Sequence, residues 1–167
     1  MLVNNAGIRE PNMALDDNGN PVPFKKAADL TGKDALEVFD TNVFGIVRVI
    51  HAFLPLLEKS AHPVIVNVSS GMGSFAAVTD PQRGESRVSV PLYSASKAAV
   101  TMLTVQYAKL LPGMRVNAAD PGLTATEFTG NSGHTVTEGA DAIIRLATLG
   151  TDGPTGTFAE REGTVAW

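Results

Sequence analysis

The apolar and polar positions of this chain alternate between two kinds of segment. Short runs of consecutive apolar, β-branched residues are typical of strands buried on both faces of a parallel sheet. Longer stretches with apolar residues every three or four positions predict amphipathic helices. In chain order, the pattern predicts a strand at residues 2–3, a helix at 31–57, a strand at 63–68, a helix at 92–111, a strand at 114–120, a helix at 138–149 and a strand at 157–167.

This order is that of a parallel α/β sheet with right-handed crossovers. Ligands of such sheets bind beyond the carboxyl ends of the strands. Three turns are expected there, at residues 5–7, 69–71 and 121–122. Residues 8–32 are expected to form a polar excursion with a turn at Asn18–Gly19, and residues 72–91, which show no sustained period, a loop.

Composition limits the function classes. The 167 residues, of which 44% are hydrophobic and 18% charged, fit one globular domain over residues 1–167. A net charge of -4 gives no basic surface for nucleic acid. There are no cysteines, the three histidines lack metal-ligand spacing, and no apolar run reaches bilayer length, so we expect no metal site, no membrane partner and a cytoplasmic location. The chain opens in mid-strand, from which we expect an N-terminal part to be missing.

Tyr93 and Lys97 are the clearest candidates for chemistry. Residues four apart on a helix lie on the same face, so the two side chains should point the same way. An ammonium beside a phenol favours the phenolate and lowers the pKa of the phenol. A tyrosine tuned in this way can pass a proton to or from a reacting oxygen.

Five short motifs together resemble the short-chain dehydrogenase/reductase family. The Tyr-Ser-Ala-Ser-Lys motif favours its classical members over the sugar-epimerase branch. The long gap between Ser70 and Tyr93, and the closing residues 153–158, resemble the carbonyl-reductase-like subgroup. The motifs, in the family's order, are Asn4-Asn5-Ala6-Gly7, Thr41-Asn42-Val43-Phe44-Gly45, Val66-Asn67-Val68-Ser69-Ser70, Tyr93-Ser94-Ala95-Ser96-Lys97 and Pro121-Gly122.

The resemblance implies a Rossmann-like doubly wound parallel sheet and an oxidoreductase that interconverts a small-molecule carbonyl and an alcohol with NADP or NAD, NADP being favoured. Ser70 would bind the reacting oxygen and Tyr93 would be the general acid or base. Lys97 would lower the pKa of Tyr93 and hold the nicotinamide ribose, and Asn42 would support Lys97 through a water. The remaining residues implied to line the cofactor are Asn5, Ala6, Gly7, Pro121, Gly122, Thr124 and Thr126.

The chain departs from the family at its start. The Gly-rich first turn and the first three strands are absent, so only the C-terminal part of the fold is expected. The alternative is therefore a catalytically silent fragment that acts, if at all, as an interaction module. A serine hydrolase using Ser70 is disfavoured, because the sequence has no Gly-x-Ser-x-Gly elbow. Substrate identity and the choice between monomer and homo-oligomer stay open.

Overall fold

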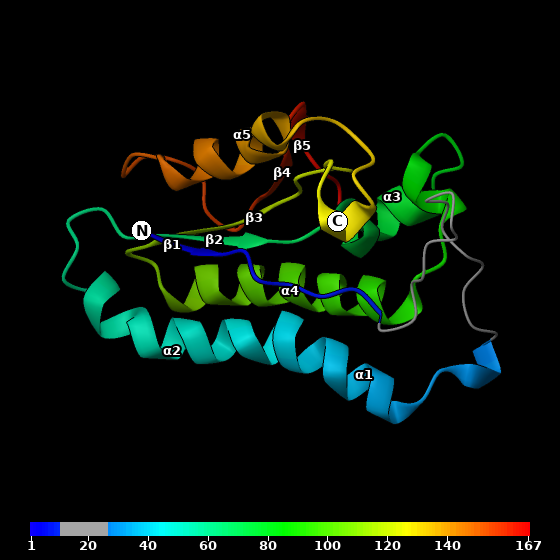
Figure 1. Cartoon of the computed structure of the whole chain (residues 1–167). Coiled ribbons are helices and arrows are strands. Elements are labelled where there is room, and N and C mark those ends of the chain that lie inside the picture. The colour runs from blue at the N-terminus through cyan, green and yellow to red at the C-terminus, as the bar shows by residue number, and fades with distance from the viewer. Residues whose placement is uncertain (11–26) are drawn as a thin grey trace.

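The computed structural model describes residues 1–10 and 27–167, so the turn expected at Asn18–Gly19 lies outside the described residues. A single sheet forms the middle layer, with α2 and α4 on one face and α5 on the other (Figure 1). Strands β1 to β4 are parallel, and β5 pairs antiparallel with β4. In sheet order, the strands are β1 Leu2–Asn4, β2 Val64–Val68, β3 Arg115–Ala119, β4 Phe158–Glu160 and β5 Gly163–Thr164.

The helices confirm the α/β alternation that the pattern predicts. The α-helices are α1 Gly32–Phe39, α2 Gly45–Leu57, α3 Phe75–Thr79, α4 Pro91–Leu110 and α5 Val136–Ala147. Between them lie short helical segments: η1 Ala27–Asp29, the π-turn η2 Asp40–Phe44, η3 Gly71–Gly73, η4 Gly84–Arg87 and η5 Glu127–Thr129.

The core is split by the sheet, because successive residues of a strand point to opposite faces. From β2, Ile65 packs with Ile50 and Val100 of the two helices below the sheet. Its neighbours Val64 and Val66 pack on the other side, in the cluster that α5 contributes to. Both faces of β2 are therefore buried, as expected for a central parallel strand.

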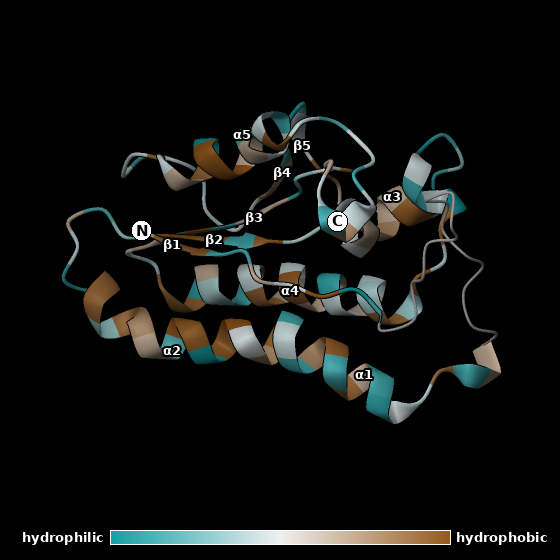
Figure 2. Ribbon diagram, viewed as in Figure 1, coloured by the Kyte–Doolittle hydropathy of each residue, from teal (hydrophilic) through white to brown (hydrophobic). Residues whose placement is uncertain are grey.

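The helix expected at 31–57 is interrupted. Thr31 caps α1 in a reciprocal capping box with Asp34, and the π-turn η2 separates α1 from α2. The whole stretch Gly32–Leu57 is long and apolar enough to cross a membrane by length and composition alone, contrary to the expectation that no such run exists. Figure 2 shows α2 as a mostly apolar helix. Core helices of soluble proteins pass the same test, so this is weak evidence for a membrane.

Two segments differ from the expected structure. Residues 72–91 contain α3 and two 3-10 turns, and they are held by bonds to the C-terminus: the amide of Ala76 donates to the carbonyl of Trp167 at 3.1 Å, and Ser74 Oγ to that of Ala166 at 2.6 Å. The expected strand at 157–167 is a hairpin of two short strands. A local pattern could not indicate α3, because the residues that hold it are distant in sequence. It could not indicate the hairpin either, because the two strands are only three and two residues long.

Candidate active site

Most of the predicted site residues gather at the carboxyl edge of the sheet. The strands end on the same side of the molecule as the start of α4 (Figure 1). Residues 5–7 follow β1, residues 69–71 follow β2, and residues 121–122 follow β3. The topology therefore places the three turns and the first turns of α4 at one rim, as the pattern predicts.

Ser70 lies close enough to Tyr93 for its side chain to act on the phenol and lower the pKa of that phenol. Ser70 is the N-cap of η3, where its Oγ accepts the amide of Met72 at 3.2 Å, and this turn fixes its direction. Ser69 is fully buried and donates instead to the carbonyl of Lys97 at 3.1 Å. Of the serine pair, the second is thus placed at the phenol and the first joins β2 to α4.

Lys97 lies beneath the ring of Tyr93. Its side chain is 4% exposed, and its Nζ lies 5.6 Å from the centre of the ring. The ammonium donates to the carbonyl of Val68, at the end of β2, at 2.8 Å. Burial disfavours the charged form and lowers the pKa of Lys97 to about 8, although the negative charge of Asp120 acts in the opposite direction.

The expected lowering of the pKa of Tyr93 is wrong for this structure. Burial of the phenol raises its pKa to about 12. The hydrogen bond from Ser70 lowers the pKa and the charge of Asp120 raises it further, but desolvation is the largest effect. The shared helix face places the two side chains together, as predicted, yet it does not reveal how deeply the phenol is buried.

Asp120 is a buried carboxylate that the sequence analysis did not single out. It is 4% exposed at the end of β3, and its Oδ1 accepts the amide of Gly122 at 2.9 Å. Burial raises its pKa, the bond from Gly122 lowers it, and the charges of Glu160 and Glu85 raise it again. Asp120 therefore holds the Pro121–Gly122 turn while adding negative charge beside the Tyr93–Lys97 pair.

Asn42 occupies the π-turn η2 and is 1% exposed. Its Oδ1 accepts the amide of Ile8 at 2.8 Å, and its Nδ2 donates to the carbonyl of Ile8 at 2.8 Å and to Ser96 Oγ at 3.0 Å. Ser96 in turn donates to the carbonyl of Tyr93 at 2.7 Å. Asn42 thus joins the segment after β1 to the first turn of α4, and π-turns of this kind are frequent at functional sites.

Gly7 leaves an open position between two of these polar groups. A Cβ at this residue would lie 3.4 Å from Asn42 Oδ1 and 3.5 Å from Lys97 Nζ. The preceding residues Asn5 and Ala6 are exposed. The segment after β1 therefore leads from two exposed residues to Gly7, which lies next to the buried ammonium.

The loop after β3 uses the hydroxyls of its predicted residues for its own structure. Thr124 Oγ1 donates to the carbonyl of Pro121 at 3.0 Å, and Thr126 begins η5 in a capping box with Thr129. Gly122 adopts a φ of 65°, a left-handed conformation that glycine reaches without strain. The Pro121–Gly122 turn and both threonines lie on the same loop, which leads to η5.

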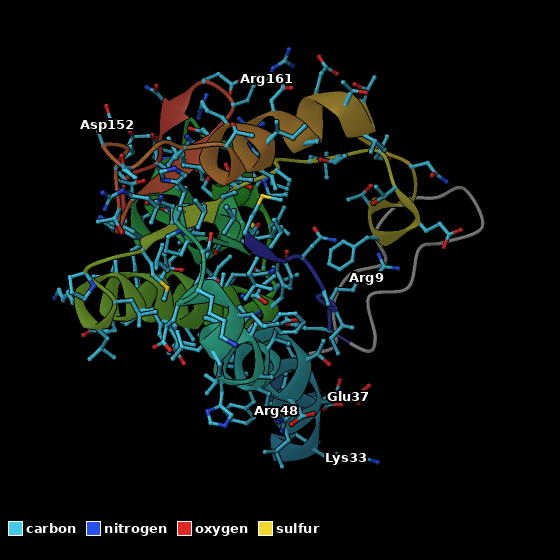
Figure 3. All side chains as sticks on the ribbon, turned by 90° about the vertical axis from the view of Figure 1, so that its left-hand side faces the viewer. Arg9, Lys33, Glu37, Arg48, Asp152 and Arg161 are labelled. Carbon is cyan, nitrogen blue, oxygen red and sulfur yellow. The ribbon has the colours of Figure 1, made fainter. Side chains whose placement is uncertain are left out.

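Phe128 packs against the ring of Tyr93, and Arg9 packs in turn against Phe128. The rings of Tyr93 and Phe128 lie 5.8 Å apart between centres and are tilted by 51°. The Arg9 guanidinium lies 5.9 Å from the centre of the Phe128 ring and donates to the Phe128 carbonyl at 2.9 Å. Figure 3 shows Arg9 beside the loop that carries η5. No local signal could have indicated this contact, since Arg9 and Phe128 are 119 residues apart.

The sequence is similar to known reductases over most of its length. Residues 1–137 match the family model described as short chain dehydrogenase. The short-chain dehydrogenase/reductase ATR10 of Stachybotrys chlorohalonatus is 33% identical over 171 residues, which cover 95% of this chain and 57% of that protein. Salutaridine reductase of Papaver bracteatum is 31% identical over 158 residues, 74% of this chain and 51% of that protein.

Two solved structures show the same likeness in three dimensions. The NADPH-bound carbonyl reductase from chicken fatty liver superposes with a TM-score of 0.77 at 29% identity, and the match covers 99% of this chain and 64% of that one. Salutaridine reductase from Papaver somniferum gives a TM-score of 0.75 at 27% identity, covering 94% of this chain and 71% of that one. The chain spans between half and two thirds of the length of most of these relatives.

Proposed function

Because the chain belongs to the short-chain dehydrogenase family, we propose that it is an NAD(P)-dependent oxidoreductase that interconverts a carbonyl and an alcohol by hydride transfer. In this proposal residues 1–167 act as a single partial Rossmann-fold domain, and Tyr93 is the general acid or base. The observation that carries the proposal is the position of the Tyr93 phenol, which lies beside Ser70 and has the buried Nζ of Lys97 5.6 Å from the centre of its ring. Few structural roles require this combination at a sheet's carboxyl edge.

The raised pKa of Tyr93 keeps the phenol in the protonated form that carbonyl reduction uses. With a pKa of about 12 the phenol is protonated at neutral pH, so it can donate a proton to the oxygen of a carbonyl as negative charge develops there. Alcohol oxidation would require the phenolate, which a group with this pKa populates to only about one part in 10⁵ at pH 7. Ser70, which lies beside the same phenol, would hold the reacting oxygen by a hydrogen bond.

In this proposal the residues at this edge would line part of a nicotinamide dinucleotide. Gly7 places no side chain next to Lys97 Nζ, and the exposed residues Asn5 and Ala6 offer contacts along the end of β1. Lys97 would bind ribose hydroxyls, while Pro121 and Gly122 would flank the nicotinamide. Thr124 and Thr126 would contact the cofactor through the same loop, and Asn42 would support Lys97. When bound, the cofactor supplies the hydride; NADP is favoured because the similar chicken carbonyl reductase binds NADPH.

A small-molecule carbonyl or alcohol is the proposed substrate class, in keeping with the carbonyl and salutaridine reductases among the similar proteins. The ring of Phe128 against Tyr93 supports an apolar or aromatic group next to the reacting carbon. The expected cytoplasmic location, without a membrane partner, stays a prediction.

The first test is a titration of the 167-residue chain with NADPH, followed by nucleotide fluorescence and by thermal unfolding. Saturable binding with a raised melting temperature is expected for the wild type. Lys97→Ala should lose both effects. Lys109→Ala is the matched control, because Lys109 is an exposed lysine at the far end of the same helix.

Activity is tested separately. Tyr93→Phe removes one oxygen atom, so it should retain NADPH binding and lose the reduction of aromatic aldehydes and ketones. A folded wild-type chain that does not bind NADPH would contradict the proposal and favour the alternative of a catalytically silent interaction module. Binding without turnover in both proteins would show that Tyr93 does not act on these carbonyls.

A further inference from the structure

Glu10 is a charged side chain that the fold buries next to the phenol-bearing helix. It is 5% exposed, and its Oε1 accepts the amide of Leu92 at 2.5 Å and that of Tyr93 at 3.0 Å. Burying a carboxylate is costly unless hydrogen bonds compensate for the lost water. The first amides of a helix are donors without partners in the helix itself. Glu10 and the start of α4 therefore satisfy each other across 82 residues of sequence.

Helix α4 has no cap of its own. Its N-cap residue Val90 makes no side-chain bond to the helix, and Pro91 at the first position has no N–H to donate. Helices α1 and α5, by contrast, have capping boxes from the adjacent Thr31 and Thr135. The amides of the second and third helical positions are those that a capping side chain normally bonds. In α4 a distant carboxylate takes over this role, where its charge also suits the positive end of the helix dipole.

The residues before Glu10 are held to the same place. Both backbone groups of Ile8 bond to the Asn42 side chain, and Arg9 bonds to the carbonyl of Phe128, whose ring packs on Tyr93. Residues 8–10 thus connect the end of β1 to the backbone of Tyr93 and to the residue covering its ring. A shift of this segment would move the phenol relative to Ser70 and Lys97.

We propose that Glu10 is a positioning residue for Tyr93: it fixes the first turn of α4 and so holds the phenol at Ser70. The inference rests on the proposed function, because positioning matters for catalysis only if Tyr93 transfers a proton. It adds to that function a residue outside every motif that indicates the family.

Two variants of the full 167-residue chain test this role. Glu10→Ala removes both hydrogen bonds. Glu10→Gln keeps an oxygen at the position of Oε1, which accepts both amides, and removes only the charge. Glu37→Ala is the control, because Glu37 is an exposed glutamate on α1 (Figure 3).

Amide hydrogen exchange, followed by NMR, reports on the helix start without any need for activity. In Glu10→Ala the amides of Leu92 and Tyr93 should exchange roughly tenfold faster than in the wild type, while those of Lys109 and Leu110 at the other end keep their rates. Glu10→Gln should stay within about threefold of the wild type. Equal acceleration along all of α4 would mean that Glu10 only stabilises the fold, and would overturn the positioning role.

The titration of Tyr93 is the second reading. The chain has two tyrosines, so in a Tyr107→Phe background the ultraviolet absorbance of the phenolate reports Tyr93 alone. If the first turn loosens, water reaches the ring and the pKa of Tyr93 should fall from about 12 towards its ordinary value of 10.0 in Glu10→Ala, but not in Glu10→Gln. An unchanged titration together with unchanged exchange in Glu10→Ala would refute the proposal.

These readings separate the inference from the proposed function. In an active chain, Glu10→Ala should lower kcat roughly tenfold with little change in the KM for NADPH, because the misplaced group is the acid. Full activity of Glu10→Ala would overturn the inference and leave the proposed function standing. A wild type that binds no NADPH, with both readings altered in Glu10→Ala, would support the positioning of Tyr93 by Glu10 and contradict the proposed function.

Discussion

The burial of Lys97 should reduce the stability of the protein, and Lys97→Met tests this. The fold lowers the pKa of Lys97 from its ordinary value of 10.5 to about 8. Between these two values the unfolded chain binds more protons than the folded one, so stability rises with pH across that window. Below pH 8 the whole cost is present; the difference between the two pKa values corresponds to about 3 kcal/mol.

The increase in the free energy of unfolding expected for Lys97→Met is smaller than the cost of burying the ammonium. Methionine has similar length and no charge, but the carbonyl of Val68 loses the bond at 2.8 Å from the ammonium. Losing such a partner costs about 1 kcal/mol. The variant should therefore be more stable than the wild type by about 2 kcal/mol at neutral pH, since the remaining contacts of a buried side chain are kept.

The lowered pKa of Lys97 also predicts how much the stability of the wild type changes with pH. Summing proton binding by both states predicts that the wild type gains about 2 kcal/mol between about pH 7 and about pH 9.5 through Lys97. Tyr93 changes the stability in the opposite direction, because burial disfavours its phenolate. The stability of the folded state therefore falls as the pH rises from 10.0 towards about 12. The chosen window ends before that loss begins.

Urea unfolding at these two pH values, for the wild type, Lys97→Met and Lys109→Met, measures both quantities. The pH-dependent gain should appear in the wild type and in the exposed control Lys109→Met, and should be absent in Lys97→Met. A Lys97→Met variant that is no more stable than the wild type at neutral pH, with the same pH dependence as the control, would refute the reasoning from burial.

Three further changes test neighbouring parts of the site. Asp120→Asn removes a negative charge that favours the ammonium and opposes the phenolate, so spectroscopic titration should show the pKa of Lys97 below about 8 and that of the phenol below about 12; unchanged values would rule out this influence. Asn42→Ala leaves the backbone of the segment after β1 without its partners and should lower the free energy of unfolding in urea by about 2–3 kcal/mol, a loss under about 1 kcal/mol counting against it. Gly73→Ala places a Cβ 2.5 Å from the backbone carbon of Lys97 and should cost about 3 kcal/mol in the same assay, whereas Gly84→Ala, with nothing within 4 Å, should be neutral.

The sequence pattern was sufficient for the layers of the fold and for the candidate residues that the structure brings to one edge of the sheet. Helix α4 begins at Pro91 and ends at Leu110 because a proline at its first position and Pro112–Gly113 after it leave little choice. The parallel strands were recognisable from their continuous apolar runs. The spacing of Tyr93 and Lys97 predicted that both lie on one helix face, and in the structure Lys97 Nζ lies 5.6 Å from the centre of the Tyr93 ring.

The residues that the pattern missed all depend on distant partners. Glu10 has an ordinary acidic side chain in a polar segment, and only the folded chain brings it to α4. Helix α3 is short, and the hydrogen bond from its Ala76 amide is accepted by the carbonyl of Trp167, which is distant in sequence. The pKa of Tyr93 depends on burial by surrounding elements, which spacing along one helix cannot reveal.

Hydrogen bonds to the main chain compensate for the burial of the charged side chains in the candidate site. Lys97 donates to a carbonyl at the end of β2, Asp120 accepts an amide after β3, and Glu10 accepts two amides of α4. Each partner is a main-chain group, of β2, of the turn after β3 or of the first turn of α4, so these hydrogen bonds do not depend on the rotamer of another side chain. The hydroxyl of Ser70 accepts the Met72 amide and also acts on the phenol of Tyr93, and a carbonyl oxygen could accept hydrogen bonds from both hydroxyls. Such an arrangement needs little rearrangement when charge develops on a bound oxygen, which is the condition under which fixed dipoles and hydrogen bonds accelerate a reaction most.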